Sequence, residues 1–350
     1  MMRTMAAVHT YSAGMVLTYE QFKKIQKACL KAGFIQETPD IWDKMEQLYC
    51  SVYQEQGIKV YLYGQAGKLY RLRVQVEPCR VLGESDPTAL AKLDRRQYRE
   101  LVKAADKMLK KLKVPCSIDK MKISRCDLTV NIEFSSQEEL MEYLRILKKS
   151  LRIYPYKHVS FKKDDQKAKD AKTANDHSYC ITCKSASFLI YDKIAQLEMI
   201  GRCDETLMGK HILRLESELK RPALKKHLGK HSMETNYKLL SSAAQKSIKV
   251  IRWYLSRMQP PCEEYLRYED AVEMVKDSNS KKKIRERMLY LLRKISDSES
   301  LTAALEKLRK KYGLSKNQCS NVLRKFEKLG ISPITLRNDS DFDMLSAIKA

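Results

Sequence analysis

The sequence predicts an α+β fold in which ferredoxin-like split βαβ units build an antiparallel sheet, followed by an all-helical C-terminal region. Three observations lead to this class. Strand and helix patterns follow one another in the order β-α-β-β-α-β over residues 121–222. Residues 1–120 show part of the same order, so they form either a degenerate second copy of the unit or another α+β domain. Residues 223–350 have helical apolar spacing and are more basic.

In the first region, a strand and an amphipathic helix precede a hairpin and a second helix. Alternating or β-rich runs flank a turn that contains two glycines, which is typical of a hairpin. The second helix has apolar residues at helical spacing and ends before a proline. The predicted elements are a strand over 16–19, a helix over 20–31, strands over 58–63 and 69–76, and a helix over 93–112.

The second region begins with a strand. The helix after it starts at a capping box in which Ser135 or Ser136 pairs with Glu138 or Glu139. A polar stretch over 162–176 then indicates a loop. The remaining predicted elements are strands over 122–134, 179–183, 187–191 and 211–220, a helix that ends near 151, and a short helix from 194.

The third region carries a predicted helix-turn-helix over residues 299–330. Residues 281–328 hold 15 Lys and Arg against 5 Asp and Glu. Ser315 and Gln318 form a capping box for the second helix, whose outward polar side chains would contact DNA. The side chains assigned to DNA binding there are Lys316, Asn317, Asn321 and Arg324. A helical hairpin that only packs against the protein is the alternative.

Charge and composition narrow the class of protein. The 350 residues include 67 Lys and Arg against 43 Asp and Glu, a formal charge of +24, which favours a nucleic-acid partner over a merely solubilising surface. No apolar run approaches the ~20 residues of a membrane span, so we expect no membrane association. The 10 cysteines are spread along the chain. They indicate reduced thiols in a cytoplasmic protein.

Carboxylates gather on the polar face of two predicted strands. Side chains alternate along a strand, so Asp127 and Asn131 share one face of the first strand, and Glu216 and Glu218 share one face of the other. Asp127 and Glu216 are candidate ligands of Mg²⁺ or Mn²⁺, assisted by Asn131 or Glu218, because these ions prefer oxygen ligands. A metal held there would polarise a phosphodiester.

Two residues at the end of the hairpin complete a candidate catalytic set. Tyr191 could attack phosphorus and form a phosphotyrosine, and Lys193 could stabilise the tyrosinate or the transition state. Arg125 and Arg214 lie on the same polar faces and are candidate DNA-binding residues. The alternative is a ladder of cross-strand ion pairs in which these arginines only neutralise the acids.

Three segments in order resemble the motifs of rolling-circle replication initiators of the filamentous-phage type and the related plasmid initiators. Residues 124–131 are similar to the R-x-D-hydrophobic strand of that family, and residues 188–193 to its Y-[DN]-K segment. Residues 213–220 are similar to its strand with an arginine and a glutamate two positions apart, although Ser217 replaces a hydrophobic residue.

The resemblance implies a replication initiation protein of a phage or plasmid that nicks and rejoins DNA in a metal-dependent reaction. It implies a covalent 5′-phosphotyrosine link, with origin DNA, single-stranded and duplex, and host helicase and polymerase as partners. Members of the family often carry a second acid where Asn131 stands, which leaves the ligand set open.

Two other classes of function are alternatives. One is a non-catalytic DNA-binding regulator of replication or transcription, which would use the same basic helices but would not need the carboxylates. The other is an RNA-binding protein, which would expose aromatic side chains on the central strands of its sheets. The corresponding positions in residues 121–222 are mainly charged.

Overall fold

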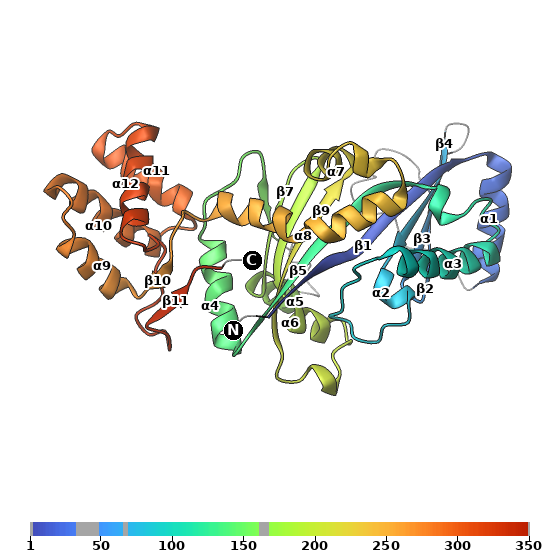
Figure 1. Cartoon of the computed structure of the whole chain (residues 1–350), viewed down its shortest axis with the longest axis horizontal. Helices are drawn as coiled ribbons and strands as arrows, with labels where there is room; N and C mark the ends of the chain where they lie inside the picture. Colours follow the sequence, from blue (N-terminus) through green and yellow to red (C-terminus); the bar gives the residue numbers. More distant parts are fainter. Residues whose placement is uncertain (1–2, 33–48, 66–68, 161–167, 349–350) are drawn as a thin grey trace.

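The computed structural model describes residues 3–32, 49–65, 69–160 and 168–348. An antiparallel sheet of nine strands, in the order β2-β3-β4-β1-β5-β9-β8-β7-β6, forms the largest part of the molecule (Figure 1). Its strands are β1 (Arg3–Leu17), β2 (Tyr49–Glu55), β3 (Ile58–Gln65), β4 (Leu69–Val76), β5 (Lys122–Phe134), β6 (Lys157–Val159), β7 (Ser178–Thr182), β8 (Ala186–Asp192) and β9 (His211–Lys220).

The helices fall into two groups. The first accompanies the sheet and consists of α1 (Tyr19–Lys31), α2 (Pro78–Val81), α3 (Arg95–Lys111), α4 (Gln137–Lys148), α5 (Ala168–Asp176), α6 (Lys193–Met199), α7 (Arg221–Leu228) and α8 (Asn236–Met258). The second lies at one end of the molecule with the short strands β10 (Glu264–Leu266) and β11 (Met344–Ser346) (Figure 1), and consists of α9 (Tyr268–Asp277), α10 (Lys282–Ser296), α11 (Leu301–Tyr312) and α12 (Lys316–Lys328).

These elements confirm the predicted α+β class with a large antiparallel sheet and a helical C-terminal region. The expected loop over 162–176 differs, because residues 168–176 form α5, while residues 162–167 lie outside the described part of the chain. Among the described residues, none of the helices has the length and apolar character needed to cross a bilayer.

The sheet consists of two halves with a similar strand order. In the first half β1 is followed along the chain by β2, β3 and β4, which lie in the order β2-β3-β4-β1. In the second half β5 is followed by the short edge strand β6 and then by β7, β8 and β9, and the strands lie in the order β6-β7-β8-β9-β5. The halves meet where β1 pairs with β5 in the antiparallel sense. The sheet therefore runs without a break across residue 120.

This strand order differs from that of a split βαβ unit. There, each helix joins two parallel strands with another strand between them. Here α6 joins β8 to β9, which are antiparallel neighbours. Helix α4 leads from β5 to the edge strand β6, which lies four places away, with β9, β8 and β7 between them. The predicted elements occur in the predicted order, with β2, β6 and α5 in addition, but the ferredoxin-like pairing is not the one that forms.

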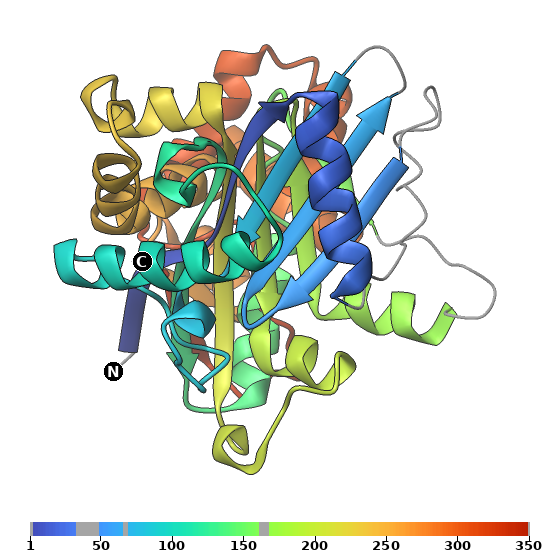
Figure 2. The same cartoon turned by 90° about the vertical axis from the view of Figure 1, so that its right-hand side faces the viewer.

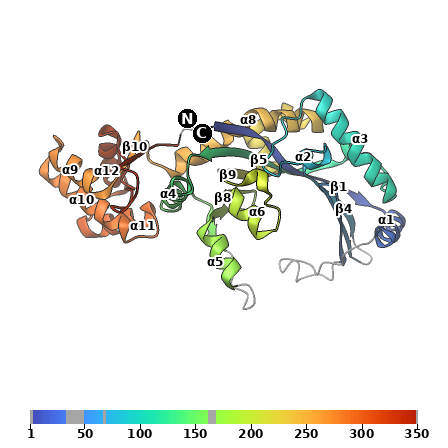
Figure 3. The same ribbon diagram turned by 90° about the horizontal axis from the view of Figure 1, so that it is seen from below.

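Helix α8 covers the apolar face of the central strands. The alternate residues Cys126, Leu128 and Val130 of β5 are fully buried on this face. The Ser247 hydroxyl donates a hydrogen bond to the Ala7 carbonyl of β1, 3.0 Å away. Viewed from below, α8 lies on one side of the sheet and α6 on the other (Figure 3). Helices α7 and α8, which follow the predicted boundary at residue 222, thus pack on the sheet.

The C-terminal helices contain the two predicted for the helix-turn-helix. Helix α11 ends at Gly313, whose φ of 61° is the left-handed conformation that glycine adopts without strain. Helix α12 begins at the predicted capping box of Ser315 and Gln318. The two helices are therefore present where the sequence predicts them.

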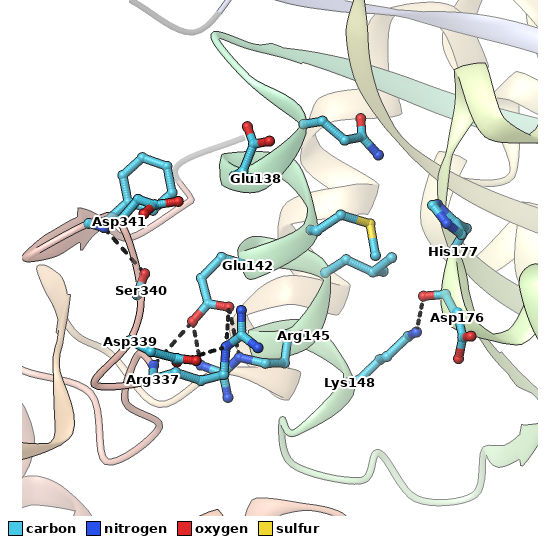
Figure 4. A pocket seen from close by; sticks show the side chains of 14 residues that line it. Glu138, Glu142, Arg145, Lys148, Asp176, His177, Arg337, Asp339, Ser340 and Asp341 are labelled. Carbon is cyan, nitrogen blue, oxygen red and sulfur yellow. Dashed lines mark hydrogen bonds and ion pairs between the residues drawn. The ribbon is translucent and has the colours of Figure 1, made fainter.

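A polar pocket lies where the C-terminal group of helices meets the part of the molecule that contains the sheet. It lies between α4 and residues 337–342, and Figure 4 shows its side chains. The buried carboxylate of Glu142 accepts hydrogen bonds from Arg145 at 2.7 and 2.9 Å, and Arg145 also donates to the Thr335 carbonyl at 2.6 Å. The hydrogen bond from Arg145 to Thr335 therefore joins the C-terminal group of helices to α4.

Figure 2 shows how the helices surround the sheet. In Figure 2, α1 (dark blue) lies across the blue strands of the first half, and α3 (teal) lies toward the left of the view with α7 and α8 (yellow to ochre). Phe22 of α1 contacts the sheet at Gly64, where a side chain would collide with its ring. The opposite face of the central strands carries the polar side chains, most of which are buried.

Candidate active site

Three carboxylates meet on the polar face of the central strands. The register pairs Asp127 of β5 with Glu218 of β9, and Thr129 with Glu216. One oxygen of each carboxylate lies within 4.8 Å of the others. Asp127 is 0% and Glu216 5% exposed, whereas the side chain of Glu218 is 27% exposed. The cluster therefore opens to solvent at the Glu218 side.

Arg125 is the cation that faces these acids. Its Nε and one Nη donate to the two oxygens of Asp127, both at 2.7 Å, and the same Nη lies 2.5 Å from a Glu218 oxygen. Burial raises the pKa of Asp127, and Arg125 opposes that rise. Burial also raises the pKa of Glu218. In both groups burial is the main cause of the rise, and the repulsion of Glu216 adds to it.

Glu216 is held ionised by its own neighbours. Burial acts to raise its pKa, but His9 and Arg214 together with the Tyr191 hydroxyl lower it to about 2. The His9 Nδ1 lies 3.5 Å from Glu216 Oε2. A shift in the β1–β5 register between Val8 and Thr10 leaves His9 unpaired on β1. The sequence gives no sign of such a bulge, so His9 was not among the predicted residues.

Tyr191 contacts the cluster directly. Its hydroxyl donates to Glu216 Oε2 at 3.0 Å. Burial and the nearby Glu216 raise the pKa of Tyr191 well above its ordinary value. Ionising this phenol therefore requires an added positive charge close to its oxygen.

Lys193 begins α6, immediately after the strand that carries Tyr191. It is 5% exposed, and its ammonium donates to Gln196 Oε1 at 2.8 Å. Burial and the charge of Arg214 lower the pKa of Lys193 to about 7. A lysine with this pKa can change its protonation state near neutral pH, which is a common property of residues at functional sites.

Two predicted residues are engaged in a separate buried network. Arg214 is fully buried, and donates to Asn131 Oδ1 and to the Thr88 carbonyl, both at 2.8 Å. The amide nitrogen of Asn131 donates to the same carbonyl at 2.8 Å. With both polar atoms used, Asn131 does not turn to the carboxylates. Arg214 has no surface for DNA, which does not fit the DNA-binding role expected of it, and it instead fixes the segment around Thr88 on the sheet.

The donor set fits a hard divalent cation. Asp127, Glu216 and Glu218 supply carboxylate oxygens, the ligands that Mg²⁺ and Mn²⁺ prefer. The Thr129 hydroxyl, which follows Asp127 on the same face, is buried without a hydrogen-bond partner in the described structure. Thr129 is paired with Glu216 across the two strands, so its hydroxyl is a further oxygen beside that carboxylate. In the structure the positive charge of Arg125 neutralises part of the charge on these carboxylates, as a bound cation would.

The predicted DNA-binding residues of α12 lie away from this cluster, in the end group of helices (Figure 1). All four, Lys316, Asn317, Asn321 and Arg324, are exposed, whereas Cys319, Val322 and Phe326 of the same helix are buried. The predicted outward position of the four side chains is thus confirmed. Neither a scan against protein-family models nor a search of the curated proteins finds a match for this chain.

Proposed function

We propose that this protein is a metal-dependent DNA strand-nicking and joining enzyme, a replication initiator of a phage or plasmid. The single observation that carries the proposal is the hydrogen bond from the Tyr191 hydroxyl to Glu216, a member of the three-carboxylate cluster. A nucleophile and a candidate metal ligand thereby occupy one site on a strongly basic chain. The order of the motifs resembling rolling-circle initiators supports the same reading.

In the proposed reaction, the phenolic oxygen of Tyr191 attacks a backbone phosphorus. A new bond forms between that oxygen and phosphorus, and the bond to the 3′ oxygen of the preceding nucleotide breaks. The phenolic proton leaves as the bond forms, and the departing 3′ oxygen takes up a proton. The product is a 5′-phosphotyrosine and a free 3′-hydroxyl, and attack by a 3′-hydroxyl reverses the step to join strands.

The surrounding residues orient and neutralise the reacting groups. Mg²⁺ or Mn²⁺, held by Asp127, Glu216 and Glu218, would offset charge on the phosphodiester. Glu216 orients the phenol through its hydrogen bond. Lys193, as an ammonium, stabilises the developing tyrosinate, for which burial alone is unfavourable.

The wider features fit a DNA enzyme of the cytoplasm. The exposed polar side chains of α12 would contact duplex origin DNA, with host helicase and polymerase as later partners. The nine cysteines whose side chains the structure describes are free thiols. Free thiols persist in a reducing compartment.

The test is a search for a covalent adduct. The full chain is incubated with Mn²⁺ or Mg²⁺ and with 5′- and 3′-labelled oligonucleotides tiled across the genetic element that encodes it. We expect an adduct with the 3′-labelled product and none for Tyr191→Phe. The matched control is Tyr179→Phe, because Tyr179 lies on the neighbouring strand β7 and bonds to Arg152 at 2.9 Å instead of to the cluster.

The outcomes separate the enzyme from the DNA-binding regulator. A specific observation favours the regulator: Arg125 already pairs with Asp127 and Glu218, as in a structural ladder of charges. Specific binding of duplex without an adduct under any divalent ion would support it. An adduct that survives Tyr191→Phe would remove Tyr191 from the mechanism.

A further inference from the structure

A basic groove lies where β1 and β4 extend beyond the start of β5. Its volume is about 970 Å³, and the described residues that line it include no acid. Four of its five cationic side chains are exposed and that of Arg221 is half-buried. The cationic residues are Arg71, Arg73, Lys120, Lys122 and Arg221. Such a concentration of one charge in a hollow attracts a polyanion.

The strand register connects this groove to the acidic cluster. Gly14 of β1 pairs with Arg73 on one side and with Lys122 on the other. Further back along β1, Ser12 pairs with Arg125, and Thr10 with Asp127. The β5 register shifts between Ser12 and Ala13, and this bulge keeps the two cations of β5 on one face. Four residues of strand, about 14 Å at 3.4 Å each, separate the groove from the Asp127 position.

The floor and wall of the groove are shaped for a chain of phosphates. At Gly14 a β-carbon would lie 2.6 Å from the Leu72 carbonyl oxygen, so that only glycine fits and no side chain stands between Arg73 and Lys122. The guanidinium of Arg73 lies 4.1 Å from the ring centre of Tyr61, which stacks with Tyr63 at 6.4 Å. An arginine held against an aromatic ring loses less freedom when it binds an anion.

We propose that this groove binds the sugar–phosphate backbone of the single DNA strand that is cut at Tyr191. The inference rests on the proposed function and adds the path of its substrate. The groove lies about four nucleotides from the cluster at the 3.4 Å spacing of a stacked strand, and fewer if the strand is stretched. Exposed Arg73 beside the rings of Tyr61 and Tyr63 is the combination of cation and aromatic that proteins use for unpaired strands.

The test measures binding and needs no cleavage. A fluorescein-labelled 20-mer of thymidine is titrated with the full chain in EDTA, and its anisotropy is recorded at several salt concentrations. The Arg73→Gln and Lys122→Gln double variant should lose two phosphate contacts. With about 0.7 of salt slope for each contact on a single strand, the slope falls by about 1.4 and affinity at 0.1 M salt by about 25-fold.

The matched control removes the same charge elsewhere. Lys103→Gln with Lys107→Gln changes two exposed lysines of α3, and should leave both affinity and slope nearly unchanged. Arg73→Lys with Lys122→Arg keeps the charges and should keep most of the binding. Thermal unfolding of each variant establishes that it is folded, and Lys122→Gln alone, expected to lose about 5-fold, serves if the double variant is not.

The results separate this inference from the proposed function. If the wild type forms no adduct but only the groove variants lose strand binding, the groove assignment holds and the nicking proposal fails. If the wild type cuts DNA while the groove variants bind and cut equally well, the groove assignment fails. An equal loss in the α3 control would show that overall charge binds the strand. An equal loss of duplex affinity in the groove variants would make the groove a duplex contact and overturn the proposal.

Discussion

Replacing Arg125 by methionine should destabilise the protein and make its stability depend on divalent cations. Arg125 gives Asp127 two hydrogen bonds at 2.7 Å and contacts Glu218. Removing one partner of a buried ion pair costs about 3–5 kcal/mol. The Arg125 side chain is 32% exposed, which weakens its interactions, so we expect about 2 kcal/mol. For a chain of 350 residues this corresponds to a fall in Tm of about 3 °C.

Mg²⁺ should restore much of that stability. With Arg125 gone, the three carboxylates have no guanidinium among them, and a divalent ion binds without displacing one. At a concentration a hundred times its Kd, the ion contributes about 2.7 kcal/mol. In the wild type the same ion must compete with Arg125, so its effect on Tm should be smaller.

The assay is thermal unfolding with and without Mg²⁺ or Mn²⁺, for wild type and Arg125→Met. Arg96→Met is the control, because Arg96 forms a pair with Glu100 on exposed α3 and should contribute almost nothing. A destabilised Arg125→Met protein with no larger response to the ion than wild type would refute the metal site. It would leave the carboxylates as a ladder of charges.

Three further predictions concern the remaining groups. The pKa of Lys193 falls from 10.5 to about 7 on folding, so the wild type loses stability as pH falls from 10.5 to 7. The Lys193→Met variant has no such group, so urea unfolding should show its free energy of unfolding rising relative to that of the wild type over this range. Asp127→Asn or Glu216→Gln should reduce metal binding at least tenfold by calorimetry, and full cleavage in EDTA by the wild type would contradict the role of the metal. Lys316→Gln with Arg324→Gln should lower the salt slope for duplex binding by about 1.8 without changing the cutting of a single strand, and an unchanged slope would assign α12 to packing.

The bounds of some elements could be predicted closely because they depend on neighbouring residues, but the strand predicted over 16–19 is the end of the much longer β1 (Arg3–Leu17), and β2 was not predicted. The strand predicted over 122–134 is β5, with the same ends, and the strand predicted over 211–220 is β9. Alternation along each strand, and a capping box at the start of α12, are local signals. The strand order depends instead on which distant strands pair. Two arrangements with the same elements have the same local pattern, so the sequence could not distinguish them.

In the candidate site, too, the features set by local sequence could be predicted and those that depend on distant segments could not. Alternation placed Asp127 on the polar face of one strand and Glu216 and Glu218 on that of another, and the pairing of β5 with β9 brings them together. It could not show that Arg214 is buried, because the carbonyl of Thr88 that accepts its hydrogen bond comes from a segment over a hundred residues earlier. His9 reaches Glu216 only through a bulge, which leaves no mark in the hydrophobic pattern.

The position of β1 in the centre of the sheet has a consequence for how the chain folds during synthesis. Ala7 pairs with Thr129, 122 positions later in the chain. When β1 leaves the ribosome, one of its two edges must therefore wait until most of β5 has been made. Long-range pairings of this kind slow folding and leave a strand edge open to wrong partners. We expect the first half to form β2, β3, β4 and β1 early, and the nine-stranded sheet to close only once the second half emerges.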